Sequence, residues 1–330
     1  MRATLCLLLA LGCTSPALGW GPDGHRMIGE LAIKGLPAQL PSFLRGGPAA
    51  EEVGYLSPEP DRERGAGPSF DAERGPAHYV DVGDDLSIAG GPKLMALPQS
   101  REQYDTLLRA RGSSQYRAGY LPYSIVQGFE LLAQDFAYWR ADAAGEKHAA
   151  NGADRAWYAK DRAMREKIVL HDIGIWSHFV GDGSMPLHAS VHYNGWGAYP
   201  NPEHFTQRHI HSPWESRYVH DNVAQGRVAA AMAPYRDCKC AIESRAARYL
   251  MASHDAVVPF YRLEKSGAFD APTARGTDFT ARQIARGAAE LRDMIVDAWR
   301  ASANGVVGFP PVAVSDIEAG TADPLDDLRY

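Results

Sequence analysis

Two histidines and an aspartate stand close together in the middle of the chain, in the segment His178-Phe-Val-Gly-Asp182-Gly-Ser-Met-Pro-Leu-His188. On a helix, residues four positions apart lie on the same face, so His178 and Asp182 can bind one cation together. The glycines and Pro186 that follow predict that the helix ends there and that the chain turns, which returns His188 toward the same place. Imidazole and carboxylate groups form a ligand set that suits zinc.

A second pair of this kind occurs at His211 and Glu215, which also stand four residues apart. The Ser-Pro dipeptide between them is typical of a helix start, with Ser as the cap and Pro in the first turn. Upstream, Asp61 and His78 lie in segments that we expect to be loops. Each of these residues alone is a weak signal, because a single histidine is more often an ordinary surface or core residue. The prediction therefore rests on the number of such residues and on their order.

The start of the chain has the features of a secretion signal. Arg2 supplies a positive charge, residues 5–11 an apolar run too short to span a membrane, and residues 17–19 a small-x-small cleavage site. Cleavage there makes Trp20 the first residue of a secreted or periplasmic protein. A lipoprotein-like site that ends at Cys13 is an alternative.

With Trp20 and His25 added, the pattern resembles a known superfamily, which comprises the fungal and plant single-strand-specific zinc nucleases and the bacterial zinc-dependent phospholipases C. Its members are all-α and hold three clustered zinc ions, and their mature chain begins with a Trp whose α-amino nitrogen and carbonyl oxygen bind metal. The superfamily order is Trp, His, Asp, His, His-x3-Asp-x5-His, His-x3-Asp or Glu. All nine positions can be filled here, over the stretch from Trp20 to Glu215.

The resemblance implies about three zinc ions per chain. The implied ligands are Asp61, His78 and His178 for one zinc, Trp20 and His25 for a second, with Asp182 as a bridge between these two, and His188, His211 and Glu215 for a third, more open zinc. Closely spaced zinc ions would lower the pKa of a shared water to near neutral and bind the phosphate oxygens. Asp81 or Asp84 is an alternative to Asp61, because the nuclease relatives often have Trp-Ala-Asp where this chain has Glu-Pro-Asp.

The superfamily divides between nucleic acids and phospholipids, and two residues favour the nuclease branch. Arg64 stands three residues after Asp61, at a position where a basic residue of the nuclease relatives can contact phosphate. Asp61 and Arg64 are therefore the catalytic candidates. Tyr79 follows His78, where an aromatic ring can stack a base of a single strand. The net charge of −6 argues against a broad basic face for duplex binding.

We therefore expect hydrolysis of single-stranded DNA or RNA to 5'-phosphorylated products, with 3'-nucleotides as further substrates and with no obligate protein partner. A secreted phospholipase C is the alternative enzyme. A structural zinc protein is the non-enzymatic alternative. Structural zinc sites are normally closed by four protein ligands, whereas the third group offers only His188, His211 and Glu215, which favours catalysis.

The loop at residues 193–210 departs from both branches and is rich in glycine, proline and aromatic residues. Trp196 or Tyr199 could wall a substrate pocket there. The histidines of this region that lie outside the pattern could contact phosphate or substrate; they are His192, His204 and His209. Farther along, Cys238 and Cys240 could pair locally, stay reduced or bind a stray metal, and no larger disulfide framework is available to the mature chain.

Helical periodicity dominates the sequence and predicts a single all-α domain of the phospholipase C/nuclease type that positions these groups. The domain is expected to cover residues 20–304, between the signal peptide at 1–19 and an irregular acidic tail at 305–330. Helices are expected from Asp23 onward and at about 122–143, 154–180, 217–253 with a break near Pro234, and 280–301. Loops are expected at about 43–77, 82–99 and 189–210.

Overall fold

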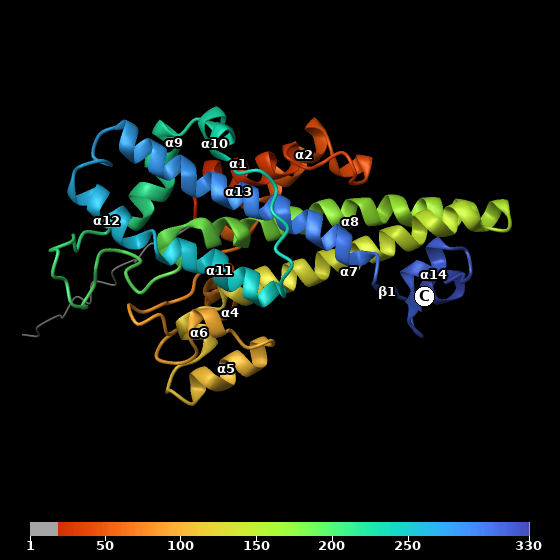
Figure 1. Ribbon diagram of the computed structural model, residues 1–330, viewed down its shortest axis with the longest axis horizontal. Helices are drawn as coiled ribbons and strands as arrows, with labels where there is room; N and C mark the ends of the chain where they lie inside the picture. Colours follow the sequence, from red (N-terminus) through yellow and green to blue (C-terminus); the bar gives the residue numbers. More distant parts are fainter. Residues whose placement is uncertain (1–18, 330) are drawn as a thin grey trace, which may run out of the picture.

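The computed structural model describes residues 19–329, so the expected signal peptide lies outside the described residues except for Gly19. The described chain is mostly helical, which confirms the all-α class (Figure 1). The strands in this part of the chain are the short antiparallel pair β1 (Val306–Val307) and β2 (Val312–Ala313). Among these residues no helix combines the length and the apolar character that crossing a membrane requires.

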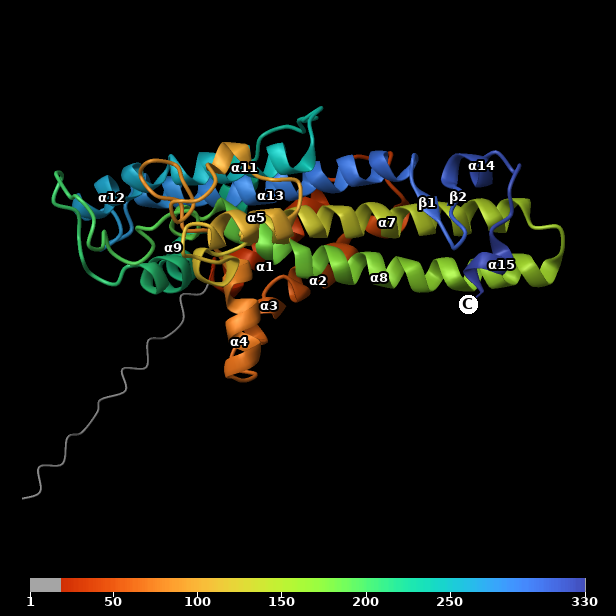
Figure 2. The same ribbon diagram turned by 90° about the horizontal axis from the view of Figure 1, so that it is seen from below.

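Two long antiparallel helices, α7 (Leu121–His148) and α8 (Gly152–Ser184), form the long axis of the molecule (Figures 1 and 2). Asn151 lies between them and caps α8, because its side-chain oxygen accepts a hydrogen bond of 2.9 Å from the first turn. The helices approach closely at Gly128, where a Cβ atom would lie 2.0 Å from the ring of Trp176. A glycine at this position therefore lets the indole ring lie against the backbone of α7.

Three further helices, α1 (Pro22–Lys34), α11 (Ile242–His254) and α13 (Ala274–Ser302), pack against this pair. Together they bury one continuous apolar core that extends from Trp20 to Ala298. The face of α13 that enters the core carries apolar side chains at the predicted three- and four-residue steps, and these are Ile284, Ala288, Leu291 and Ile295.

Shorter elements surround the ends of the long helices. They are α2 (Gly47–Leu56), α3 (Glu59–Arg62), α4 (Pro68–Arg74), α5 (Arg101–Arg109), α6 (Gln115–Ala118), α9 (Val219–Asn222), α10 (Gln225–Ala231), α12 (Val257–Lys265), α14 (Val314–Glu318) and α15 (Leu325–Leu328). Single turns of 3-10 helix cover Ser42–Leu44, Gly75–His78, Leu94–Ala96 and Pro186–His188, and a π-helical turn covers Pro213–Tyr218.

The prediction of a loop at about 43–77 was wrong, because α2, α3 and α4 form within this range. Each of these helices has a proline in its first turn, which presets the backbone for a helix where the missing N–H group is not needed. Helix α5 was not predicted from the sequence. Its N-cap residue Ser100 accepts a hydrogen bond of 3.1 Å from Gln103 N. Prolines that suggested loops here begin helices instead.

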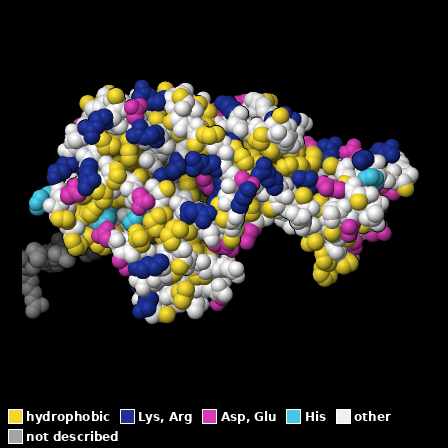
Figure 3. Space-filling model, viewed as in Figure 1, with side chains coloured by type: hydrophobic (Ala, Val, Ile, Leu, Met, Phe, Trp, Pro, Cys, Tyr) yellow, Lys and Arg dark blue, Asp and Glu magenta, His cyan; other side chains and the backbone are white. Residues whose placement is uncertain are grey.

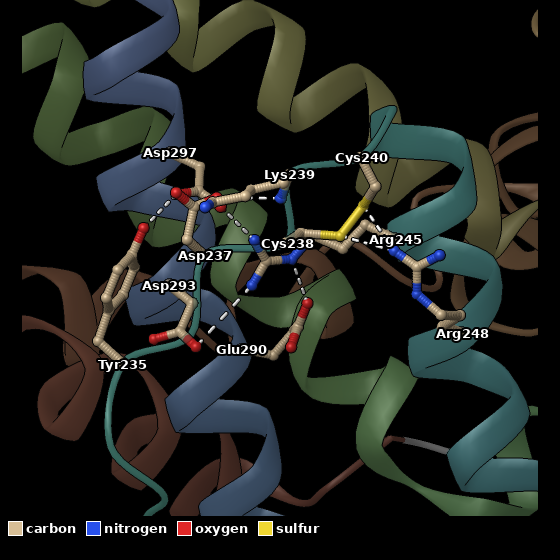
Figure 4. The surroundings of a disulfide bond; sticks show 10 residues. All are labelled: Tyr235, Asp237, Cys238, Lys239, Cys240, Arg245, Arg248, Glu290, Asp293 and Asp297. Atoms are coloured by element: carbon tan, nitrogen blue, oxygen red, sulfur yellow. Dashed lines mark hydrogen bonds and ion pairs between the residues drawn. A yellow bond between two sulfur atoms is a disulfide. The ribbon is translucent and has the colours of Figure 1, made fainter.

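The expected helix at 217–253 is divided more widely than a break near Pro234 predicted. The helical part of this range ends first with α10 and resumes with α11, and residues 232–241 between these two helices are not helical. This non-helical segment contains a disulfide bond between Cys238 and Cys240 (Figure 4), which selects the local pairing among the three alternatives. Arg248 Nη2 lies 2.7 and 2.6 Å from the two sulfur atoms.

The expected irregular tail at 305–330 was also wrong. The β1–β2 hairpin is followed by α14 and α15, and this segment packs on α7 at the end of the long helices (Figure 2). A small second apolar cluster holds it there, with Val307, Val314 and Ile317 against alanines of α7. Strands of two residues and helices of four or five residues leave little periodicity in a sequence, so the pattern did not predict them.

Candidate metal centre

The candidate ligands converge near the C-terminal end of α8. That helix brings His178 and Asp182 onto one face, as their spacing predicts. It ends at Ser184, and the following 3-10 turn returns His188 toward the same place. The side chains that meet there are buried, none more than 2% exposed: His25, His78, His178, Asp182, His188, His211 and Glu215. Asp61 joins them from α3 with 11% of its side chain exposed.

One group of donor atoms surrounds His178. Its Nε2 atom lies 2.9 Å from His78 Nδ1, and the Oδ2 atom of Asp182 lies 3.0 Å from His78 Nδ1 and 3.3 Å from His178 Nε2. Asp61 Oδ1 completes the group at 3.8 Å from His78 Nδ1 and 3.7 Å from His178 Nε2. Ligands around a tetrahedral zinc at about 2.0–2.1 Å stand roughly 3.3 Å apart, so these separations suit one small cation.

His25 extends this group toward the start of the described chain. Its ring stacks on His178 with centroids 3.9 Å apart, and its Nε2 atom lies 3.5 Å from Asp182 Oδ1. Asp182 therefore faces two sets of histidines with its two oxygen atoms, which is the arrangement that a bridging carboxylate requires.

Trp20 is held next to this set by its side chain. Its Nε1 atom donates a hydrogen bond of 2.7 Å to Ser184 Oγ, and its ring meets Trp214 edge-on at 5.1 Å. A Cβ atom built on Gly19 would lie 1.7 Å from Asp182 Oδ1 and 2.8 Å from His25 Nε2. The backbone that leads into Trp20 thus runs directly beside the candidate ligands.

The third group consists of His188, His211 and Glu215. The Nε2 atoms of the two histidines are 3.0 Å apart, and Glu215 Oε2 lies 2.8 Å from His211 Nε2. The segment is tied to the start of α1, because Gly21 N donates a hydrogen bond of 3.1 Å to Glu215 O. This set offers three side chains that could hold a metal ion.

Backbone carbonyl groups orient three of the rings. The Nδ1 atom of His178 donates to Ser57 O at 2.9 Å, that of His188 to His78 O at 2.5 Å, and that of His211 to Tyr193 O at 2.8 Å. In each ring the Nε2 atom is then the lone-pair donor, and it points into the cluster. Metal-binding histidines are oriented in this way.

The donors fit a cation. Within the described residues, both ring nitrogens of His25, Asp61 Oδ1 and Asp182 Oδ1 are buried without a hydrogen-bond partner. Burial lowers the pKa of His25 well below its usual value and that of His78 to about 3, so both rings stay neutral and able to bind metal. Although burial alone would raise it, His178 and His188 hold the pKa of Asp182 well below its usual range. These buried clusters could therefore hold metal ions.

A cleft of about 870 Å³ opens beside the cluster and is lined by His78, His188 and His211. The substrate candidates Arg64 and Tyr79 also line it, and Arg64 Nε lies 3.3 Å from Asp61 Oδ1. Burial raises the pKa of Tyr79 to about 12, so its hydroxyl group stays neutral at physiological pH.

Gly119 fixes the backbone of Tyr79 at the cleft. It has a φ of +78°, and a Cβ atom there would lie 2.0 Å from Tyr79 O. The neighbouring Leu121 N donates a hydrogen bond of 3.1 Å to the same oxygen. A left-handed conformation and this close approach both require glycine.

The alternatives to Asp61 lie elsewhere. Asp84 accepts a hydrogen bond of 2.9 Å from His192 Nε2, outside the three groups. Asp81 lines the cleft, where burial raises the pKa of its carboxyl group to about 7. Of the three acids, only Asp61 falls in one of the described groups of candidate ligands.

The loop at 193–210 differs from the expectation. Trp196 does not wall the cleft, because it is buried between His192 and Tyr261, with ring centroids 3.7 and 5.2 Å away. His204 and His209 are exposed. The loop contributes Tyr193 instead, which lines the cleft and whose carbonyl oxygen orients His211. Sequence reasoning missed Tyr193, although its position next to His192 offered a signal.

Comparison of the chain with protein-family models, with curated proteins and with solved structures found no match, so the interpretation of the site rests on its own geometry.

Proposed function

We propose that this protein is a zinc-dependent phosphodiesterase that cleaves single-stranded DNA or RNA to 5'-phosphorylated products, with the fold and the zinc cluster of the nuclease and phospholipase C superfamily. One observation carries the proposal. His188 and His211 belong to a ligand group with three protein side chains, and they line the same cleft as Tyr79 and Arg64. An open ligand group in a substrate-sized cleft is the arrangement of a catalytic zinc site and not of a structural one.

We assign about three zinc ions to the three ligand groups, with Asp182 shared between the first two. Zinc ions bound there would supply an acidic water and electrostatic stabilisation of phosphate oxygens. The protein's own part is to orient the donors. The carbonyl groups of Ser57, His78 and Tyr193 fix the ring tautomers, and burial keeps water from competing for the histidine nitrogens.

The cleft residues would bind the substrate. The ring of Tyr79 offers a face for an unstacked base, and the neutral hydroxyl group adds no repulsion toward phosphate. Arg64 would bind a phosphate oxygen while Asp61 limits the positions its guanidinium group can take. The face in Figure 3 carries basic and acidic side chains intermixed, so it offers little to hold a duplex.

The decisive experiment compares four substrates with the purified protein that begins at Trp20: single-stranded DNA, RNA, a 3'-nucleotide and phosphatidylcholine. Each is assayed with zinc and after chelation, and the ends of the products are identified by labelling. We expect zinc-dependent cleavage of DNA and RNA that leaves 5'-phosphates. Hydrolysis of phosphatidylcholine without cleavage of either nucleic acid would move the protein to the phospholipase branch. Zinc binding without hydrolysis of any substrate would favour a structural zinc protein.

A further inference from the structure

The cleft continues past the candidate ligands along a wall made by α4 and α6. Six residues of this wall line the cleft, namely Phe70, Asp71, Ala72, Arg74, Tyr116 and Arg117. We call its two aromatic residues and its two arginines the rim cluster: Phe70, Arg74, Tyr116 and Arg117. In Figure 2, α4 stands out from the body of helices, and none of its residues is buried, so this helix is not part of the core. The pattern that identified the metal ligands does not include any of these four residues.

The rim cluster combines exposed aromatic rings with guanidinium groups. Phe70 and Tyr116 are each 37% exposed, and the guanidinium group of Arg74 lies 5.8 Å from the centre of the Phe70 ring. Arg117 is exposed and forms no ion pair within residues 19–329, whereas Arg74 Nη2 lies 3.5 Å from Glu63 Oε2. The wall thus brings two positive charges to the cleft beside the one carboxylate of Asp71. Aromatic faces that stack bases, together with arginines near the backbone, are how proteins hold single strands.

Contacts of α4 with Tyr116 of α6 and with the following Tyr120 hold the wall in place. Tyr116 donates a hydrogen bond of 3.4 Å to Glu73 Oε2, and Tyr120 donates one of 2.6 Å to Glu73 O. The rings of Tyr116 and Tyr120 meet edge-on at 6.3 Å. The exposed ring of Tyr116 therefore has a defined orientation before any ligand binds, which reduces the entropy lost on binding.

The cleft is also large for one nucleotide. Pockets for small ligands measure roughly 300–1,000 Å³, and the volume of about 870 Å³ is near the top of that range. Tyr79 accounts for one base next to the ligands. We propose that the rim cluster is a second nucleotide subsite, which stacks a base of the strand that flanks the bond to be cleaved and binds its phosphate. This inference rests on the proposed function.

The test measures binding and cleavage separately. Thymidine oligonucleotides of two, four and eight units with hydrolysis-resistant phosphorothioate linkages are titrated against the zinc-loaded protein by fluorescence anisotropy. Stacking of one base contributes about 1–3 kcal/mol, so Phe70→Ala should weaken binding of the tetramer by about 5- to 150-fold. Binding of the dimer should stay within about twofold, and Phe70→Trp should restore the tetramer affinity. Zinc content should not change, because Phe70 contacts none of the ligands.

Tyr55 provides a matched control. It is 61% exposed and has Arg62 5.1 Å from its ring centre, but it does not line the cleft, so Tyr55→Ala should bind all oligonucleotides like the wild type. Unchanged tetramer binding by Phe70→Ala, or an equal loss in Tyr55→Ala, overturns the subsite. Cleavage of ordinary oligonucleotides by the wild type, measured in parallel, tests the proposed function by itself. A wild type that cleaves them without any gain in affinity with length refutes only the subsite.

Discussion

The Nε2 atoms of His188 and His211 face each other at 3.0 Å, while the Nδ1 atom of each ring donates to a backbone carbonyl oxygen. Because both Nδ1 atoms carry the protons of the neutral rings, both Nε2 atoms present lone pairs to the same point. Glu215 Oε2, 2.8 Å from His211 Nε2, adds negative charge there. Two lone pairs and a carboxylate at one point are a donor set that could hold a divalent cation.

Replacement of His178 tests the metal cluster. We expect about three zinc ions per wild-type chain by elemental analysis, and at least one fewer in His178→Ala, because this side chain faces both His78 and Asp182. Asp182→Asn should lose the most zinc and more than about 100-fold in activity, since Asp182 serves two groups. The exposed His171, seven residues earlier on α8, is the control, and His171→Ala should keep full zinc content. No more than one zinc in the wild type would contradict the cluster.

An added residue before Trp20 should damage the second metal site. The backbone at Gly19 lies so close to Asp182 that even one Cβ atom would collide with the carboxylate. We expect a protein with Ala before Trp20 to bind one zinc fewer and to lose most activity, with the helical signal in circular dichroism unchanged. Full activity and full zinc content in such a protein would show that the amino group of Trp20 is not a ligand.

Tyr79 and Arg64 should separate binding from turnover. Tyr79→Ala should raise KM for single-stranded DNA by about 5- to 150-fold, the value of one stacked base, with little change in zinc content. Tyr79→Phe keeps the ring and serves as the control, which should behave like the wild type. Arg64→Ala should lower kcat with a modest effect on KM. Steady-state kinetics on one oligonucleotide measures both constants. A lower kcat in Tyr79→Ala together with a higher KM in Arg64→Ala would contradict these assignments.

Asp142 makes stability depend on pH. Burial raises the pKa of this carboxyl group from an ordinary value near 4 to about 8, with Asp161 as a further cause. A raised pKa means that the folded protein binds the proton more tightly, so stability is greatest at acid pH and falls as the pH rises through about 8. The loss between pH 6 and 9 is on the order of 2 kcal/mol, or about 4 °C in Tm.

Asp142→Asn should therefore flatten the fall of Tm between pH 6 and 9. The flattening should be partial, because burial also raises the pKa of Asp135 to about 7. Asp278→Asn, whose side chain is 47% exposed on α13, should leave the pH dependence as it is in the wild type. Differential scanning calorimetry across this pH range measures both, and equal slopes in the wild type and in Asp142→Asn would refute the assignment.

The disulfide between Cys238 and Cys240 should matter little for catalysis. It closes a loop of only three residues, for which the stabilisation of the folded state is about 1–2 kcal/mol. Neither cysteine lines the cleft beside the candidate ligands. We expect the double variant Cys238→Ser, Cys240→Ser to keep its zinc content and activity, with Tm lower by a few degrees. A loss of zinc in this variant would show that the segment supports the metal centre.

What could be predicted from the sequence follows from periodicity. His178 and Asp182 stand on a long helix with a regular apolar face, so their common orientation was predictable and is confirmed. The same regularity predicted α7 and α13. Asp61 could not be distinguished from Asp81 or Asp84 by pattern, because all three stand where the sequence has no period. What distinguishes Asp61 from the other two acids is the packing of α3 on α8, which is a tertiary contact.

Other features had no local signal at all. The hydrogen bond from His211 Nδ1 to Tyr193 O connects the two ends of an irregular loop. The burial of Trp196 depends on Tyr261 from α12. The folded tail is fixed by its contacts with α7. In each case residues far apart in the chain decide the outcome, and the local sequence is compatible with several results.

His78 contacts three groups that come much later in the chain: it meets His178, Asp182 and His188, which are 100, 104 and 110 residues away. The centre is therefore an element of high contact order, which cannot form until α8 has docked against the N-terminal segment. The entropy of closing such loops must be lost before any ligand group is complete. Under the proposed zinc assignment, metal binding would be one of the last events in folding, and the kinetics of zinc uptake would report the completed tertiary structure.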